Sequence, residues 1–354
     1  MNIGMHVVST EPLIIHGYNY SNVLSPAKEL SPYLRKHKVT FLISVAWSLL
    51  VRNRLEKAAA VYRKQKRKYP QHDIYVLAND QAEYDGLQAV GVPAVFCNHN
   101  AFLDEREYTI VPAEKKYNGV INSRMKPYKR IELARGTKGL CIIASDTKLY
   151  PEYTNFLLDS MPDMDFIQFE NRKFRRCLNN RQIGELYGAC RSGLILSAEE
   201  GACFAAAEYL LCGLPVVTTH NLGGRDTFFH EDYTVWCDDT PEGVKEAVDK
   251  VVGLSISAEE IRRRTIKLAR EQRGNYIATL NEIAAKAGRD IDFSTLWDEI
   301  YINKMYRMYG TEKDALEHLR SKGVKTAPSF YRTFRHYHEA AKQKYKSLLR
   351  KMGQ

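Results

Sequence analysis

Two glutamates, Glu200 and Glu208, lie eight residues apart in the stretch SAEEGACFAAAEYLLCGLPVVTTHNLGGRD (residues 197–226). An apolar strand pattern leads into Glu200, and a helix pattern opened by Gly201 carries Glu208. In open α/β sheets, ligands bind beyond the carboxyl ends of strands, so Glu200 is expected at a ligand-binding edge. Carboxylates repel phosphate but accept hydrogen bonds from neutral hydroxyls. Sugars and riboses present such hydroxyls, whereas the first amides of the helix suit phosphate.

The order of these residues resembles the retaining glycosyltransferases of the GT-B fold, particularly glycosyltransferase family 4. The match consists of Glu200-x7-Glu208, followed by CGLPVVTT and a Gly-Gly loop. A second match is YNGVINSRMKPYKRIELA, in which Arg124 and Lys129 have the spacing of the family's Arg/Lys pair. The family usually has a glycine before the Arg and another after the Lys. This sequence has Ser123 and Arg130 at those two positions. A third match, QIGELYGACRSGLILS, leads into the glutamates, and the whole resemblance covers roughly residues 117–240.

The resemblance implies a role for each matching residue. Arg124 and Lys129 would neutralise the diphosphate of a nucleotide-sugar, including the charge that develops on the leaving group. Glu208 would hold the ribose hydroxyls, and Glu200 would bind hydroxyls of the donor sugar and orient its anomeric carbon. The expected donor is a UDP- or GDP-sugar, and neither a bound metal nor a separate cofactor is expected. Transfer would retain the anomeric configuration.

Three further assignments follow from position in the family pattern. The segment Phe169–Asn171 lies where the family holds the base, so Phe169 and Asn171 are candidate base contacts. The amides of Gly201 and Ala202 are candidates for the donor's phosphate or sugar. His99 follows an apolar strand pattern in the first domain, and we expect it near the donor sugar, as a positioning or proton-handling group.

The elements that must carry these residues alternate between short apolar runs and amphipathic stretches, which is typical of parallel sheets covered by helices. The expected fold class is therefore α/β, and the resemblance implies GT-B, with two Rossmann-like domains whose parallel sheets face a cleft. We predict an acceptor-side domain over residues 1–115, a nucleotide-sugar domain over 116–290, and a helical segment over 291–354 that packs back on the first domain. The strands are predicted at 40–45, 74–77, 94–97, 117–121, 140–143, 166–168, 193–196 and 215–218, and helices include 82–90, 130–134, 183–190 and 202–212.

Composition narrows the remaining classes. The 354 residues are 44% hydrophobic and carry a net charge of +10, which excludes a disordered chain and favours an anionic partner. The seven cysteines lack Cys-x-x-Cys spacing, and no transmembrane anchor or signal peptide is evident, so we expect a cytoplasmic protein. Basic residues gather at 51–70 (net +7) and 331–354 (net +6), which predicts two basic helices that can dock on an anionic membrane surface.

Two other classes stay open at this point. An epimerase or dehydrogenase acting on nucleotide-sugars is disfavoured because no G-x-G-x-x-G motif opens the first strand-helix unit. A basic nucleic-acid-binding protein is disfavoured because the sequence contains no recognised nucleic-acid module, so no nucleic-acid partner is expected. The favoured hypothesis is a hexosyltransferase-type enzyme with a glycan or lipid-linked acceptor, in cell-surface polysaccharide or glycolipid synthesis.

Overall fold

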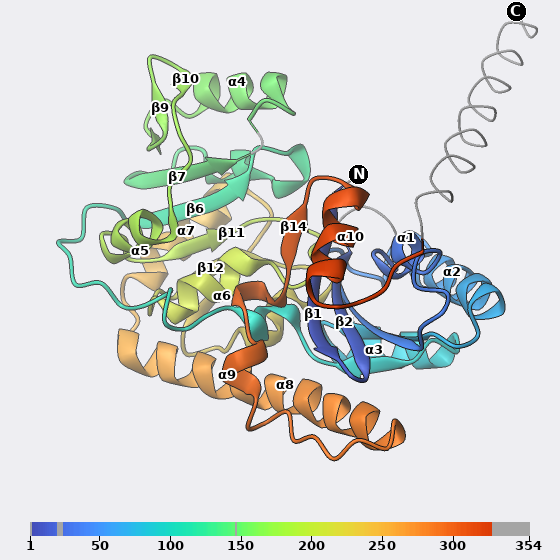
Figure 1. Ribbon diagram of the computed structural model, residues 1–354. Coiled ribbons are helices and arrows are strands. Elements are labelled where there is room, and N and C mark those ends of the chain that lie inside the picture. Colours follow the sequence, from blue (N-terminus) through green and yellow to red (C-terminus); the bar gives the residue numbers. More distant parts are fainter. Residues whose placement is uncertain (1, 20–23, 146, 328–354) are drawn as a thin grey trace, which may run out of the picture.

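Two six-stranded sheets lie next to each other in the computed structural model, which describes residues 2–19, 24–145 and 147–327 (Figure 1). The first sheet has the order β14-β1-β2-β3-β4-β5, with the strands Ile3–Thr10 (β1), Leu13–Asn19 (β2), Val39–Val45 (β3), Asp73–Ala78 (β4), Ala94–Phe96 (β5) and Arg307–Tyr309 (β14). The second has the order β13-β12-β11-β6-β7-β8, with the strands Gly119–Arg124 (β6), Leu140–Ser145 (β7), Asp165–Phe166 (β8), Gly193–Ile195 (β11), Val216–Thr219 (β12) and Thr234–Cys237 (β13). A small hairpin joins Phe169–Glu170 (β9) to Lys173–Phe174 (β10).

Parallel pairing dominates both sheets. The second sheet is parallel throughout, whereas in the first sheet β1 pairs antiparallel with both β2 and β14. Every residue of β3 is buried, which agrees with its unbroken apolar and β-branched sequence, VTFLISV. Because parallel strands in a sheet end on the same side, each sheet presents one edge of loops that can carry a ligand site.

Helices cover these sheets and connect their strands. The α-helices are Ala27–Leu30 (α1), Arg54–Lys68 (α2), Gln81–Ala89 (α3), Pro151–Ser160 (α4), Asn180–Gly188 (α5), Phe204–Leu211 (α6), Pro241–Val251 (α7), Ala258–Lys286 (α8), Trp297–Ile300 (α9) and Glu312–Ser321 (α10). Short 3₁₀ turns are His99–Phe102 (η1), Pro127–Lys129 (η2), Ile131–Ala134 (η3), Gly224–Phe228 (η4) and Asn303–Met305 (η5). Local sequence sets several starts: Asn179 and Gln182 form a capping box on α5, and the Ser257 side chain caps α8.

The long helix α8 connects the two halves of the molecule. It contacts α6 of the second half and both β5 and η1 of the first half, and it lies beneath both in Figure 1. After α8 the chain returns to the first sheet, where β14 pairs with β1 and α10 packs against β1 and α1. No helix within the described residues is long and apolar enough to cross a membrane.

Most of the predicted elements are present, with several corrections. The helix expected from Ala202 begins at Phe204, so Gly201 does not open it, because Cys203 takes a left-handed backbone (φ 58°) before the first turn. The helix expected at 130–134 is a 3₁₀ turn, and the segment over 291–354, expected to be helical, contains strand β14. The prediction also omitted the strands β1, β2, β9, β10 and β13. The basic stretch 51–70 contains helix α2, whereas 331–354 lies outside the described residues.

Buried amide groups join the loops of the two sheets. The Nδ2 of Asn98 donates to the carbonyl oxygens of Asn79 and Gly224, both at 2.8 Å, and the Nδ2 of Asn100 donates to that of Ala202 at 2.6 Å. Gly223 has φ +122°, and an added Cβ would lie 2.0 Å from the carbonyl oxygen of Glu200. The loop after β12 can therefore approach the loop after β11 this closely only with glycine at this position.

We predict that Gly223→Ala destabilises the protein because it adds a backbone clash to the cost of a left-handed conformation. The matched control is Gly136→Ala, since Gly136 has φ +78° but nothing within 4 Å of an added Cβ. We expect Gly136→Ala to lower the unfolding free energy by about 1 kcal/mol and Gly223→Ala by at least about 2 kcal/mol more. Chemical denaturation of the two variants measures the difference, and equal losses would contradict the close approach.

Candidate active site

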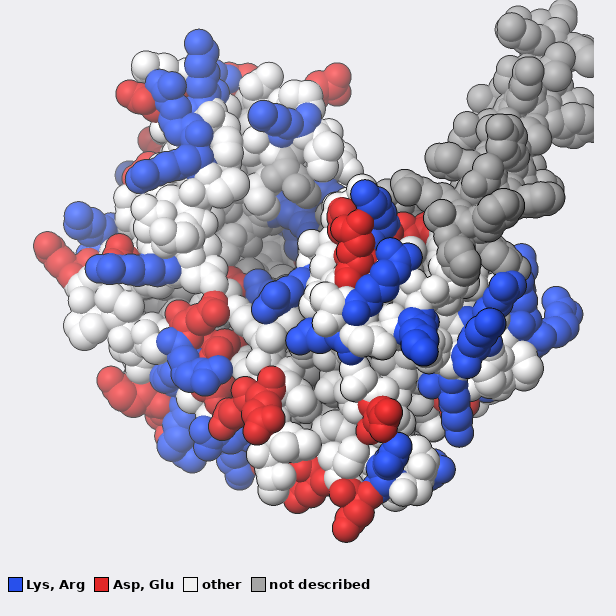
Figure 2. Space-filling view, viewed as in Figure 1, with Lys and Arg blue, Asp and Glu red and all other residues white. Residues whose placement is uncertain are grey.

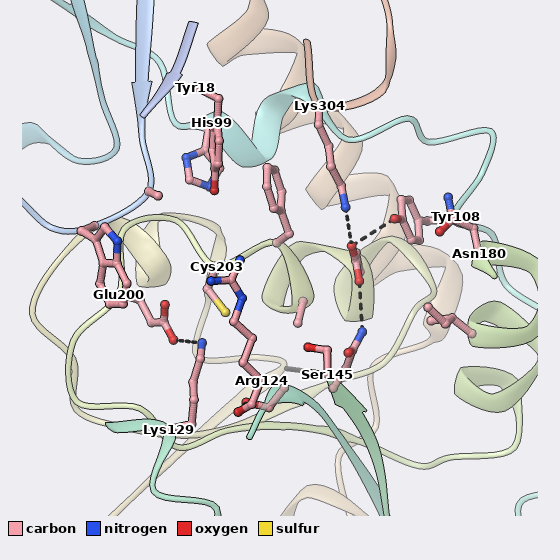
Figure 3. A pocket seen from close by; sticks show the side chains of 18 of the residues that line it. Tyr18, His99, Tyr108, Arg124, Lys129, Ser145, Asn180, Glu200, Cys203 and Lys304 are labelled. Carbon is pink, nitrogen blue, oxygen red and sulfur yellow. Dashed lines mark hydrogen bonds and ion pairs between the residues drawn. The ribbon is translucent and has the colours of Figure 1, made fainter. Parts of the chain in front are cut away.

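A cavity of about 300 Å³ lies where the carboxyl ends of the two sheets meet (Figure 3). The first sheet contributes Tyr18 from β2 and Trp47 and His99 from the loops after β3 and β5. The second sheet contributes side chains from the ends of β6 and β11 and from α6, and these include Arg124, Lys129, Glu200 and Glu208. The Arg124/Lys129 pair and the Glu200/Glu208 pair, which the sequence predicted as ligand-binding groups, therefore line one cavity.

Lys129 and Glu200 form a buried ion pair. The Nζ of Lys129 donates to Oε1 of Glu200, and the hydroxyl of Ser197 donates to the same oxygen at 2.7 Å. Only 14% of the Lys129 side chain and 7% of the Glu200 side chain are exposed. Burial by itself lowers the pKa of Lys129, but the Glu200 carboxylate raises it, and the net pKa lies above its ordinary value. Lys129 is thus a permanently charged cation on the cavity wall.

Arg124 and Arg130 leave the same loop in different directions. Arg124 ends β6, and its side chain points into the cavity toward Cys203 (Figure 3). Arg130 adopts φ 51°, the left-handed conformation that the family's glycine would take without strain. Its guanidinium binds Asp239 and donates to the Leu196 carbonyl and to the Thr219 hydroxyl, both at 2.7 Å. The departure from glycine therefore ties this loop to the ends of β11 and β12.

Glu208 lies in the second turn of α6 and accepts hydrogen bonds at both carboxylate oxygens. Its Oε1 accepts from the Tyr108 hydroxyl at 3.0 Å and lies 3.3 Å from Nζ of Lys304. Its Oε2 accepts from Nδ2 of Asn122 and from the Tyr187 hydroxyl, each at 3.4 Å. Burial, together with the Glu208 charge, raises the pKa of Tyr108, so the phenol stays protonated as a donor.

His99 is buried, with 3% of its surface exposed, and its ring packs against aromatic neighbours. The ring centroid lies 4.5 Å from that of Phe204 and 5.8 Å from that of Tyr18. Within the described part of the chain, its Nδ1 has no hydrogen-bond partner. Burial lowers the pKa of His99 to about 3, so the imidazole is neutral near pH 7. A neutral imidazole can accept or donate one hydrogen bond to a hydroxyl in the cavity.

Four of the predicted contacts do not line this cavity. An added Cβ on Gly201 would lie 2.8 Å from the Ala46 backbone, so this glycine serves the packing between the two loops. Ala202 is fully buried, and its carbonyl accepts from Asn100. Phe169 packs between the rings of Phe166 and Phe174, at 5.7 and 5.5 Å. Asn171 is exposed in the β9–β10 turn with φ 48°.

Sequence reasoning missed several cavity residues. Trp47 follows β3 and contacts Tyr128 across the two sheets, with ring centroids 5.2 Å apart. The strand-end rule could have found Trp47, and Tyr128 lies within the Arg124–Lys129 motif. No motif pointed to Tyr108 or Lys304, because neither residue belongs to one of the predicted motifs. Among the residues with described positions, no group of three or more His, Cys, Asp or Glu side chains is arranged to hold a metal ion.

Comparison with solved structures identifies the fold. The chain is similar to the Anabaena protein HepE in complex with UDP, with a TM-score of 0.50 and 14% identity over 71% of this chain and 72% of HepE. It is also similar to the sucrose-phosphate synthase of Thermosynechococcus elongatus, with a TM-score of 0.50 and 14% identity over 69% of this chain and 68% of the synthase. No protein-family model and no curated protein sequence matches the chain. The predicted GT-B fold, known from glycosyltransferases, is confirmed.

We predict that His99 stays neutral down to about pH 4, because its folded-state pKa is about 3. The pKa lies below its unfolded value near 6.5, so the contribution of His99 to stability is complete above that pH and is lost as the pH falls toward 3. Heteronuclear NMR of ring-labelled histidine, assigned with a His99→Gln variant, measures this titration. A His99 midpoint near pH 6.5 would contradict the buried environment.

Proposed function

We propose that the protein is a retaining glycosyltransferase that moves a sugar from a nucleoside-diphosphate sugar to a glycan or lipid-linked acceptor, in cell-surface polysaccharide or glycolipid synthesis. One observation carries the proposal. Two cations, Arg124 and Lys129, and two carboxylates, Glu200 and Glu208, come from separate motifs and line one cavity between two GT-B sheets. Cations suit a diphosphate, and carboxylates suit sugar and ribose hydroxyls.

In this proposal each group has one task in the transfer. Arg124 and Lys129 bind the diphosphate and stabilise the charge that develops as the glycosidic bond breaks, without a bound metal. Glu200 accepts hydrogen bonds from donor-sugar hydroxyls, and Glu208 accepts from the ribose. Neutral His99, on the opposite wall, contacts the donor sugar. The acceptor attacks from the face that the leaving group occupies, so the anomeric configuration is retained.

The structural neighbours support a nucleotide-sugar donor. HepE has been crystallised with UDP and also with UDP and glucose, and the latter complex has a TM-score of 0.50 to this chain. These neighbours support this class more than they support an epimerase or dehydrogenase.

Contacts between the loops of the two sheets support closure around the donor. The Glu199 carboxylate beside the cavity binds two arginines of the first half. Arg52, two residues before the first residue of α2, lies 3.1 Å from it, and Arg54, the first residue of α2, forms the second ion pair. Trp47 also lies against Tyr128 across the same boundary. Closure of this kind excludes water that would otherwise hydrolyse the donor.

Helix α2 supports docking on an anionic surface, on the cytoplasmic side of a membrane. Lys and Arg side chains gather over α2 in Figure 2. Those of α2 that are exposed are Lys57, Arg63, Lys64, Arg67 and Lys68. Such a cluster attracts anionic lipid headgroups, which would bring the enzyme to a lipid-linked acceptor.

We predict that Glu200→Gln lowers turnover by about a hundredfold or more, because the amide keeps the size of the side chain but loses its charge. Nucleoside diphosphate released from a panel of UDP- and GDP-sugars measures the rate. The matched control is Glu185→Gln, whose side chain is 52% exposed on α5 and whose carboxylate pairs with the exposed Arg181. Wild-type turnover in Glu200→Gln would remove Glu200 from the site.

A thermal-shift screen tests the donor class. We predict that UDP or GDP raises the melting temperature of the wild-type protein and that Lys129→Met reduces this shift, since the variant loses a buried phosphate-binding cation. Lys250→Met, at an exposed position on α7, should keep the full shift. A wild-type protein that none of UDP, GDP, ADP or CMP stabilises would contradict the proposed function.

A further inference from the structure

Lys304 brings a cation into the cavity from a part of the chain that carries none of the predicted motifs. It belongs to η5, between α9 and β14, where the chain passes from the second half of the molecule back to the first sheet. Its side chain reaches into the cavity in Figure 3, and its Nζ lies 3.3 Å from Oε1 of Glu208. Among the residues that the structure describes, the cavity is therefore lined by three cationic side chains, Arg124, Lys129 and Lys304, and by two carboxylates, Glu200 and Glu208.

The backbone around Lys304 is held firmly in an uncommon conformation. Lys304 and Met305 have φ values of 65° and 54°, in the left-handed region that non-glycine residues rarely adopt. Asn303 anchors the turn, since it accepts from the Asp104 amide at 3.1 Å and donates to Glu107 at 2.8 Å. Met305 is fully buried. Conformations of this kind persist where the surroundings fix them, and they concentrate at functional sites.

The ammonium group lies beside the start of helix α6. Its Nζ is 4.6 Å from the ring centroid of Phe204, the first residue of that helix. Arg124 points toward Cys203, the residue before it (Figure 3). Lys304 thus lies beside the end of a helix whose first amides carry a partial positive charge, and Arg124 lines the same cavity. This is the region of the cavity most suited to a phosphate group.

The Glu208 carboxylate has hydrogen-bond donors other than Lys304. Without Lys304, its Oε1 keeps the hydrogen bond from Tyr108, and its Oε2 keeps those from Asn122 and Tyr187. The Lys304 side chain is 29% exposed, against 14% for Lys129, so it has more room to move within the cavity. A long, flexible side chain held at 3.3 Å can change partners without leaving a buried carboxylate unpaired.

We propose that Lys304 binds the donor's diphosphate and changes partner when the donor enters: its ammonium leaves Glu208 for a phosphate oxygen, and a ribose hydroxyl takes its place on Oε1 of Glu208. The inference rests on the proposed function. In the structure, Lys304 is the counterion of Glu208. With the donor bound, it becomes a third phosphate-binding cation beside Arg124 and Lys129.

Calorimetric titration of UDP and uridine, and of GDP and guanosine, separates the phosphate from the nucleoside. We expect Lys304→Met to weaken binding of the diphosphate by about ten- to a hundredfold, because it removes one hydrogen bond to a charged group. Binding of the matching nucleoside should change by less than about threefold, since Glu208 keeps its other donors. Lys304→Arg, which keeps the charge, should restore most of the diphosphate affinity. The matched control is Lys313→Met, since Lys313 is an exposed residue of α10.

Each outcome decides between distinct explanations. Equal weakening of diphosphate and nucleoside would mean that Lys304 acts only through Glu208, and it would overturn the inference. A wild-type protein that binds neither UDP nor GDP would overturn the proposed function, and the inference with it. An independent measurement uses the unmutated protein: UDP or GDP, but not the nucleoside, should shield Lys304 from an amine-acetylating reagent, as read by mass spectrometry. Equal labelling with and without diphosphate would again overturn the inference.

Discussion

Charged side chains that are buried in a cavity need partners of opposite charge or hydrogen-bonding groups, and this constraint organises the site. A cation or carboxylate removed from water without a partner is strongly unfavourable. Lys129 is therefore paired with Glu200, and Lys304 with Glu208. Each pair joins a group suited to phosphate with a group suited to hydroxyls. A donor that carries both kinds of group can replace each internal partner with one of its own.

These pairs need loops with a well-defined backbone, and buried polar side chains hold the loops in place. Arg225 is fully buried, and its guanidinium donates to the carbonyl oxygens of Ser197 and Thr219 and to Asp226. On the first sheet, the Glu83 carboxylate accepts from the amides of Leu49 and Asn79. The loops on both sides of the cavity are thus held by side chains that never reach it.

Sequence could predict the parts of the site that lie within local patterns. The Glu200-x7-Glu208 spacing and the Arg124/Lys129 pair lie on one strand-loop-helix unit each, so local order along the chain fixes their neighbourhood. The sequence did not predict Tyr108 and Lys304 as site residues, because only tertiary packing brings them to Glu208. Tyr108 is 100 residues from Glu208 in the sequence, and Lys304 is 96 residues from it. Strand β1 was not predicted because polar residues and a glycine interrupt the apolar pattern of its sequence, IGMHVVST. In the sheet it lies between β14 and β2.

The pairing of β14 with β1 also has a consequence for how the protein is made. Strand β1 leaves the ribosome before β14, which follows it by about three hundred residues. Until β14 arrives, one edge of β1 has unpaired backbone N–H and C=O groups that another chain could bind. A contact between such distant segments also forms slowly, because a long loop must close first. Synthesis of the nascent chain therefore includes a period in which the first sheet is open at one edge and prone to association.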